Sequence, residues 1–76
     1  MAGIRFTAAA LAELARLHIS PQDVITGLIG AEATLVDQDS GLLQVMFRDS
    51  GALFTLLLMP DEDVLWVIAV EREGGR

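Results

Sequence analysis

Cysteine, lysine and tyrosine are absent from this chain of 76 residues, and histidine occurs only once, at His18. Without cysteine, neither a disulfide framework nor a thiolate zinc site can form. A single histidine also excludes a metal site built from several imidazoles. No apolar run approaches the ~20 residues of a membrane-spanning helix, and the first residues lack the apolar core of a signal peptide. We therefore expect a cytoplasmic protein that has no contact with membranes.

Positive charge is scarce as well, and this bears on the class of partner. Eleven acidic side chains outnumber five arginines, which gives a net charge of −6. Affinity for a phosphate backbone comes mainly from lysine and arginine, so direct binding of nucleic acid is disfavoured. The negative surface also keeps a small apolar domain soluble. If the charge serves recognition, the expected partner is a basic protein.

What the chain does contain is apolar residues, which make up 53% of the sequence. This content is incompatible with intrinsic disorder, and the length suits one domain whose core is only marginally large. We expect a single domain over residues 1–76, with a frayed tail at about residues 72–76. Additional burial through oligomerisation would support a core of this size.

The first half of the chain predicts a pair of helices. Thr7 is a plausible N-cap for a helix from Ala8 to about His18, because its hydroxyl can accept a hydrogen bond from a free helical N–H. Ser20 followed by Pro21 gives the same signal for a second helix. Gly30 fits the left-handed position that ends many helices.

The remaining sequence predicts strands. Ile4 to Phe6 forms a short first strand, and four more strands lie between Ala33 and Glu71, separated by acidic turns with Gly41 and Gly51 in two of them. The predicted fold is α+β, in the order β-α-α-β-β-β-β. Two helices should pack on one face of a four- to five-stranded, mainly antiparallel sheet. The predicted core comprises Leu11, Leu14, Val24, Ile25, Leu28, Val45, Phe47, Phe54, Leu56, Trp66 and Ile68.

Two of these strands are apolar on both faces. Residues 53–59 and 64–70 form almost continuous apolar runs, whereas a strand between core and water alternates apolar and polar residues. Two short helices can cover only one face of the sheet. We therefore predict that a second copy covers the other face, forming a homodimer through Leu53, Leu57, Met59, Leu65 and Val67.

A simple meander would also gather acidic residues at one end of the sheet. Its first and third hairpin turns fall at the same end, so their carboxylates should share a rim. This predicted acidic rim consists of Asp37, Asp39, Asp61, Glu62 and Asp63. The alternative reading is that aspartate is simply common in turns.

No catalytic constellation emerges from the sequence. Asp37, Asp39 and Gly41 have the spacing that opens a calcium loop, but its twelfth position, which needs a bidentate glutamate, is Arg48. His18 has no evident serine or cysteine nucleophile to activate. We predict no catalytic, cofactor-binding or metal-binding residue, and no enzymatic activity.

Four segments carry a resemblance to a known family: Ile4-Arg5-Phe6-Thr7, Leu11-x-x-Leu14-Ala15-Arg16, Ile19-Ser20-Pro21-Gln22-Asp23-Val24, and the ending Ile68-Ala69-Val70-Glu71-Arg72. With the order of elements, they resemble the RelE/ParE-type toxin superfamily, near its small bacterial members. Those members usually carry a histidine before the first helix, where this chain has Thr7-Ala8-Ala9. Its ribonucleases use lysine, arginine and often tyrosine, whereas here only Arg48 and Arg72 are expected on the sheet. The resemblance implies a module that contacts a protein target rather than one that cleaves RNA.

Two functions follow from these observations. The first is a non-catalytic interaction module, toxin-like and homodimeric, that acts through a protein partner. The second is a small acidic inhibitor, of the phage anti-defence or nucleic-acid-mimic type, that blocks a basic nucleic-acid-binding protein.

Overall fold

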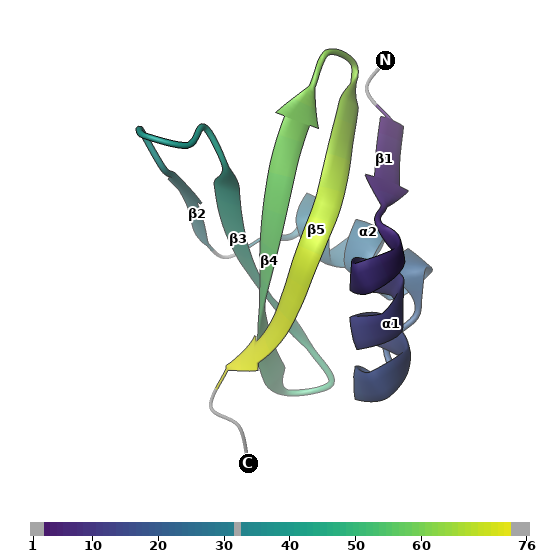
Figure 1. The fold of residues 1–76 in the computed structure, drawn as a ribbon. Helices are drawn as coiled ribbons and strands as arrows, with labels where there is room; N and C mark the ends of the chain where they lie inside the picture. Colours follow the sequence, from purple (N-terminus) through teal and green to yellow (C-terminus); the bar gives the residue numbers. More distant parts are fainter. Residues whose placement is uncertain (1–2, 32, 74–76) are drawn as a thin grey trace.

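The protein is an α+β domain, as the sequence predicted. A computed structural model describes residues 3–31 and 33–73. Along the chain, two helices follow the first strand and precede the remaining four (Figure 1). The elements are β1 (Gly3–Phe6), α1 (Ala8–Leu17), α2 (Pro21–Ile29), β2 (Ala33–Val36), β3 (Leu43–Asp49), β4 (Ala52–Asp61) and β5 (Val64–Glu73). Of the tail expected at about residues 72–76, Arg72 and Glu73 belong to β5 and the rest lies outside the described residues.

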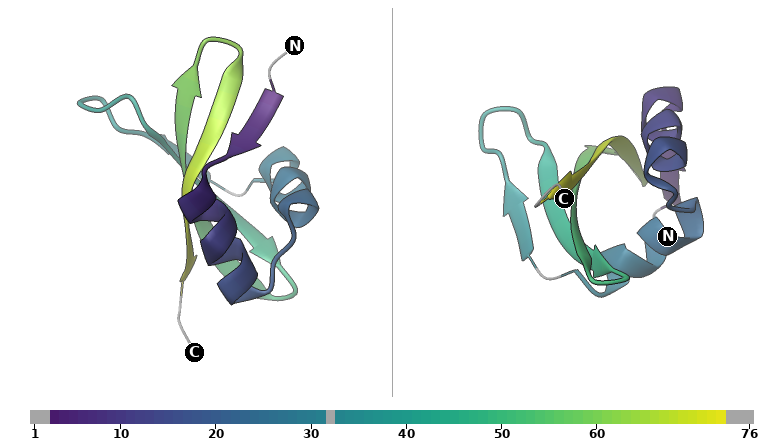
Figure 2. Two further views of the ribbon diagram at one scale, coloured as in Figure 1. Left: turned by 45° about the vertical axis from the view of Figure 1, so that its right-hand side comes forward. Right: turned by 90° about the horizontal axis from the view of Figure 1, so that it is seen from below.

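The sheet has the strand order β1-β5-β4-β3-β2. Strands β2 to β5 form the predicted antiparallel meander, and β1 adds to β5 in parallel. The sheet is strongly curved, and both helices close the open side of the curve (Figure 2). The core therefore lies between the helices and the inner side of the sheet.

Both predicted helix starts are confirmed. The Thr7 hydroxyl accepts a hydrogen bond from the Ala10 N–H at 3.1 Å, and the Ser20 hydroxyl accepts one from the Asp23 N–H at 3.1 Å. The helix ends differ from the prediction. His18, not Gly30, adopts the left-handed conformation, with φ values of 60° and −102° respectively. The chain must reverse sharply at His18, because α2 begins at Pro21, only three residues later.

The core consists mainly of aliphatic side chains around a pair of phenylalanines. Phe47 on β3 and Phe54 on β4 stack with their ring centroids 5.6 Å apart. Helix α2 approaches this pair at Gly27, where an added Cβ would lie only 2.2 Å from the Phe47 ring. The buried hydrophobic residues are Ala10, Leu14, Ile19, Val24, Val45, Phe47, Phe54, Leu56, Leu58, Val67 and Val70.

An irregularity in β5 overturns part of the predicted core. Leu57 pairs with Ala69 whereas Leu58 pairs with Val67, so Ile68 is an extra residue without a partner on β4. Such a bulge inverts the alternation of side chains beyond it. Val67 and Val70 are therefore buried, and Trp66 and Ile68, which were predicted to be buried, are only half-buried.

The prediction for α1 was also wrong at one position. Leu11 is 45% exposed, because α1 packs on the sheet through Ala10 and Leu14. On α2, Ile25 and Leu28 are half-buried, and Leu28 packs against the core.

Candidate functional site

One face of the sheet is turned away from both helices, and we call it the uncovered face. Because paired residues on neighbouring strands share a face, the register defines it. Leu35 pairs with Gln44, Gln44 with Leu57, and Leu57 with Ala69, which makes one row across four strands. The row of Met46, Thr55 and Glu71 and the row of Met59 and Trp66 flank it, and a third row contains Arg48, Leu53 and Glu73. The uncovered face comprises Arg5, Leu35, Gln44, Met46, Arg48, Leu53, Thr55, Leu57, Met59, Trp66, Ala69, Glu71 and Glu73.

Leu57 lies at the centre of this face, between two shallow hollows. One hollow is lined by residues of β2, β3, β4 and the turn between β2 and β3, and the other by residues of β3, β4 and β5. Gln44 and Leu57 line both hollows, so the two are continuous across the sheet. The first hollow also includes Leu35, Val36, Asp37 and Leu42, and the second Thr55, Ala69, Val70 and Glu71.

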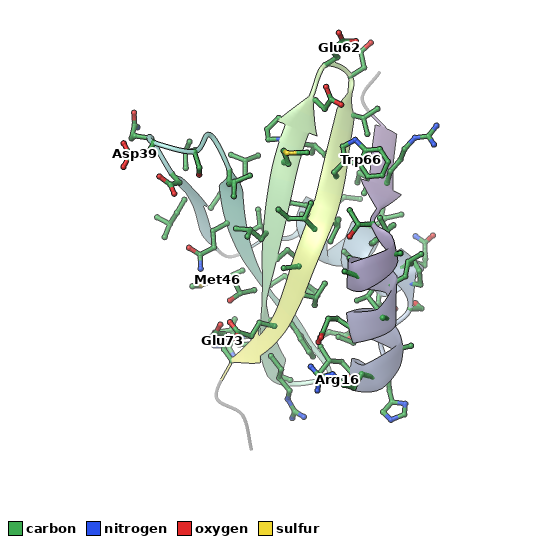
Figure 3. All side chains as sticks on the ribbon, viewed as in Figure 1. Arg16, Asp39, Met46, Glu62, Trp66 and Glu73 are labelled. Atoms are coloured by element: carbon green, nitrogen blue, oxygen red, sulfur yellow. The ribbon has the colours of Figure 1, made fainter. Side chains whose placement is uncertain are left out.

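The exposed side chains of this face include the large apolar Leu35 and Met59 together with the charged Arg5, Arg48 and Glu71. Leu35 is 58% exposed and Met59 is 42% exposed, while Met46 and Trp66 are half-buried on the same face (Figure 3). Exposed apolar residues that form a contiguous patch mark interaction surfaces, whereas scattered ones do not. The register makes these residues contiguous.

The one buried polar residue of the described core region also lies on this face, and it is satisfied within the chain. Thr55 is 7% exposed, and its hydroxyl donates a hydrogen bond to Glu73 Oε2 at 2.9 Å. Among the described residues, no buried side-chain nitrogen or oxygen lacks a partner. A molecule that covers Thr55 would therefore leave its hydroxyl paired, which avoids the usual cost of burying an unpaired polar group.

The structure divides the five residues predicted for the dimer interface between the two faces. By the register, Leu53, Leu57 and Met59 lie on the uncovered face. Leu65 and Val67 do not, because the bulge at Ile68 assigns them to the helix-covered face. Val67 is fully buried in the core, and Leu65 pairs with Ile4, which packs against that core.

Sequence reasoning missed three large apolar residues of the uncovered face, Leu35, Met46 and Trp66. Strict alternation counted along β5 placed Trp66 inside, and no sequence signal marks the bulge that moves it. Leu35 and Met46 follow the ordinary alternation of β2 and β3. The same alternation, applied to β2 and β3, would have assigned both residues to the face that the helices leave uncovered.

The predicted acidic rim becomes two separate hairpin tips at one end of the sheet. Asp39 lies in the turn between β2 and β3, and Glu62 in the turn between β4 and β5 (Figure 3). In the first turn, the Asp37 carboxylate accepts a hydrogen bond from the Asp39 N–H at 3.0 Å. Bonds from the Asp39 and Ser40 backbone and from the Ser40 side chain lower the pKa of Asp37. The Asp37 carboxylate thus holds its own turn together through these hydrogen bonds, which explains an aspartate at this position without a ligand.

Neither the acidic tips nor any other described part of the chain gathers metal ligands. Within residues 3–31 and 33–73, no group of three or more histidine or acidic side chains is placed to hold a metal ion. His18, the lone histidine, is exposed at the end of α1.

Comparison with known proteins finds no protein-family model, curated protein or solved structure that matches this chain. Over the described residues, neither helix has the length and apolar character needed to cross a membrane.

Proposed function

We propose that this protein is a non-catalytic protein–protein interaction module, and that its uncovered face forms a homodimer. The observation that carries the proposal is the contiguous apolar surface centred on Leu57, on a side of the sheet that neither helix covers. A monomeric protein seldom leaves such a surface in water. Burying Thr55 would leave no unpaired hydroxyl, since that hydroxyl already donates a hydrogen bond to Glu73.

The proposed dimer would bury surface from several strands. The molecule exposes 5005 Å² in total, and a standard interface buries ~800 Å² per partner. Burying several hundred Å² of apolar surface contributes on the order of 10 kcal/mol before the costs of association. Association costs of about 4–15 kcal/mol offset much of this gross contribution, so the net affinity depends on how well the two copies pack.

The test is the mass of the protein in solution, measured by sedimentation equilibrium. Leu57→Arg introduces a charge at the centre of the uncovered face and should convert the dimer into a monomer. The matched control is Ile29→Arg, since Ile29 is 86% exposed at the end of α2, on the helix side. The control should remain dimeric, and both variants should keep the circular dichroism spectrum of the natural protein. A monomeric natural protein at micromolar concentrations, or a folded dimer of Leu57→Arg, would contradict the proposal.

We propose in addition a toxin-like mode of action on a protein target, as the resemblance to RelE/ParE-type toxins implies. It rests on the element order, in which β1 and the two helices precede the antiparallel strands. Expression of the chain in bacteria should then arrest growth, and a neighbouring gene product should relieve the arrest. Normal growth at high expression would argue against this mode.

The second candidate function is an acidic inhibitor of a basic nucleic-acid-binding protein. It is favoured by the meander, which brings the turns that contain Asp39 and Glu62 to the same end of the sheet. Surface charge pairs are screened by salt, so the affinity for such a partner should fall steeply as the salt concentration rises. Neutralising Asp37, Asp39, Asp61, Glu62 and Asp63 to their amides should abolish binding. Binding that is indifferent to both changes would exclude the inhibitor role.

A further inference from the structure

A second surface lies along the outer edge of β5 and shares Ala69 and Glu71 with the uncovered face. Strand β4 pairs with β5 along most of its length, but β1 pairs with the opposite edge only from Val64 to Val67. The β1 ladder ends with the Thr7 N–H, which donates to the Val67 carbonyl at 3.1 Å before α1 begins. Within the described residues, no strand pairs with this edge of β5 from Ile68 to Glu73. We call residues 68–73 the open edge.

Helix α1 makes this edge one wall of a groove. It runs beside the lower half of β5 (Figure 1), and its side chains Ala9, Glu13 and Arg16 line the groove opposite Ile68 to Glu71. The three helical residues are spaced i, i+4 and i+7, so they form one stripe along the helix. Ala9 and Ala69 are small and leave room near the end of β1. Further along, Glu13 and Arg16 form an ion pair with each other.

The chemistry of the groove specifies its occupant. An open strand edge presents a row of backbone N–H and C=O groups, and another extended backbone is the ligand that pairs with such a row throughout its length. The charged lining consists of Glu13, Arg16 and Glu71, with one excess negative charge, on a chain whose net charge is −6. A basic residue in the ligand is therefore complementary.

We propose that the groove between α1 and the open edge binds an extended segment of a partner protein as a sixth strand beside β5. The segment carries at least one lysine or arginine. This site adjoins the proposed dimer interface and shares Ala69 and Glu71 with it, but it does not include Leu57.

The proposal can be tested with a synthetic peptide, acetyl-Lys-Val-Thr-Val-Thr-Val-Lys-amide, titrated into isotope-labelled protein and followed by NMR. The amide signals of residues 68–73 and of the α1 stripe should shift in a saturable manner. Methylating alternate peptide nitrogens removes several hydrogen-bond donors and should weaken binding about tenfold or more. Replacing both lysines by aspartate should weaken it as well.

Two protein variants locate the site. Ala9→Trp fills the groove from the helix side and should abolish the shifts at the open edge. Ala12→Trp adds the same side chain at an exposed position of α1 that does not line the groove, and should leave binding unchanged. The Leu57→Arg variant should still bind the peptide, because Leu57 does not line the groove. Loss of the dimer and loss of peptide binding can therefore be observed separately.

Three results would overturn the proposal. One is the absence of saturable shifts at residues 68–73 up to about 1 mM peptide, the limit of weak specific binding. Another is equal affinity for the methylated peptide, which would mean that the edge forms no ladder. The third is a change in oligomeric mass caused by Ala9→Trp but not by Ala12→Trp, which would make a second copy the occupant.

Discussion

Replacing Gly27 by alanine would place a methyl group so close to the Phe47 ring that the two would overlap. The added Cβ would lie 2.2 Å from Cδ2, 2.6 Å from Cγ and 2.7 Å from Cε2, whereas ordinary contacts begin at 3.4 Å. The ring has little freedom to move away. Phe47 is 1% exposed and stacks on Phe54, which is itself 5% exposed. Helix α2 must therefore shift outward by about 1 Å, or Phe47 must leave its favoured position.

The expected magnitude follows from two opposing terms. Overpacking a core typically costs about 1–3 kcal/mol. Alanine stabilises a helix by up to about 1 kcal/mol relative to glycine, which offsets part of that cost. We expect Gly27→Ala to lower the free energy of unfolding by about 1–2 kcal/mol. For a domain of this size, the melting temperature should fall by roughly 5–15 °C.

Thermal unfolding followed by circular dichroism measures the effect, and the chain provides its own control. Gly30 has a φ of −102° and nothing within 4 Å of an added Cβ, so Gly30→Ala should change stability by no more than about 0.5 kcal/mol. Adding Phe47→Leu to Gly27→Ala should cost less than the sum of the two single changes, because the clash has been removed. Equal melting temperatures for Gly27→Ala and Gly30→Ala would refute the reasoning.

Three further predictions concern the core, the cap of α1 and the first acidic turn. Leu58 is 1% exposed, so Leu58→Ala should cost about 2–5 kcal/mol in chemical denaturation, whereas Met59→Ala beside it, at 42% exposure, should cost far less. Thr7→Ala removes the bond to the Ala10 N–H and should cost about 0.5–2 kcal/mol, while Thr7→Ser should restore most of the loss in the same assay. The lowered pKa of Asp37 means that its carboxylate stabilises the folded state above the ordinary value of 3.8, and that this contribution is lost as the pH falls through the folded pKa. Melting temperatures of the natural protein and of Asp37→Asn should therefore converge below about pH 3.8, and a constant difference down to pH 2 would contradict this assignment.

Much of the fold could be predicted from the sequence because its signals are local. The hydroxyls of Thr7 and Ser20 cap helices whatever surrounds them, since the N–H groups that they satisfy lie within three residues. Gly41 and Gly51, with φ values of 76° and 82°, end their turns in a conformation that the turn itself requires. The continuous apolar runs in β4 and β5 also indicated correctly that both faces of the sheet are apolar.

The candidate site was predictable only in part, because its membership depends on register. Leu57 and Met59 were assigned to the uncovered face by simple alternation along β4. Trp66 and Val67 exchange faces because Ile68 bulges, and a bulge is a property of two paired strands rather than of one segment.

The sequence by itself determined the order of elements, the helix starts, the turns and the apolar character of both sheet faces. Each of these is encoded within a few consecutive residues. Only the tertiary structure decided which face each β5 side chain occupies, how closely α2 approaches Phe47 at Gly27, and that the edge of β5 beyond Val67 is open beside α1. These features arise where segments far apart in the chain meet, and the local pattern of neither segment contains them.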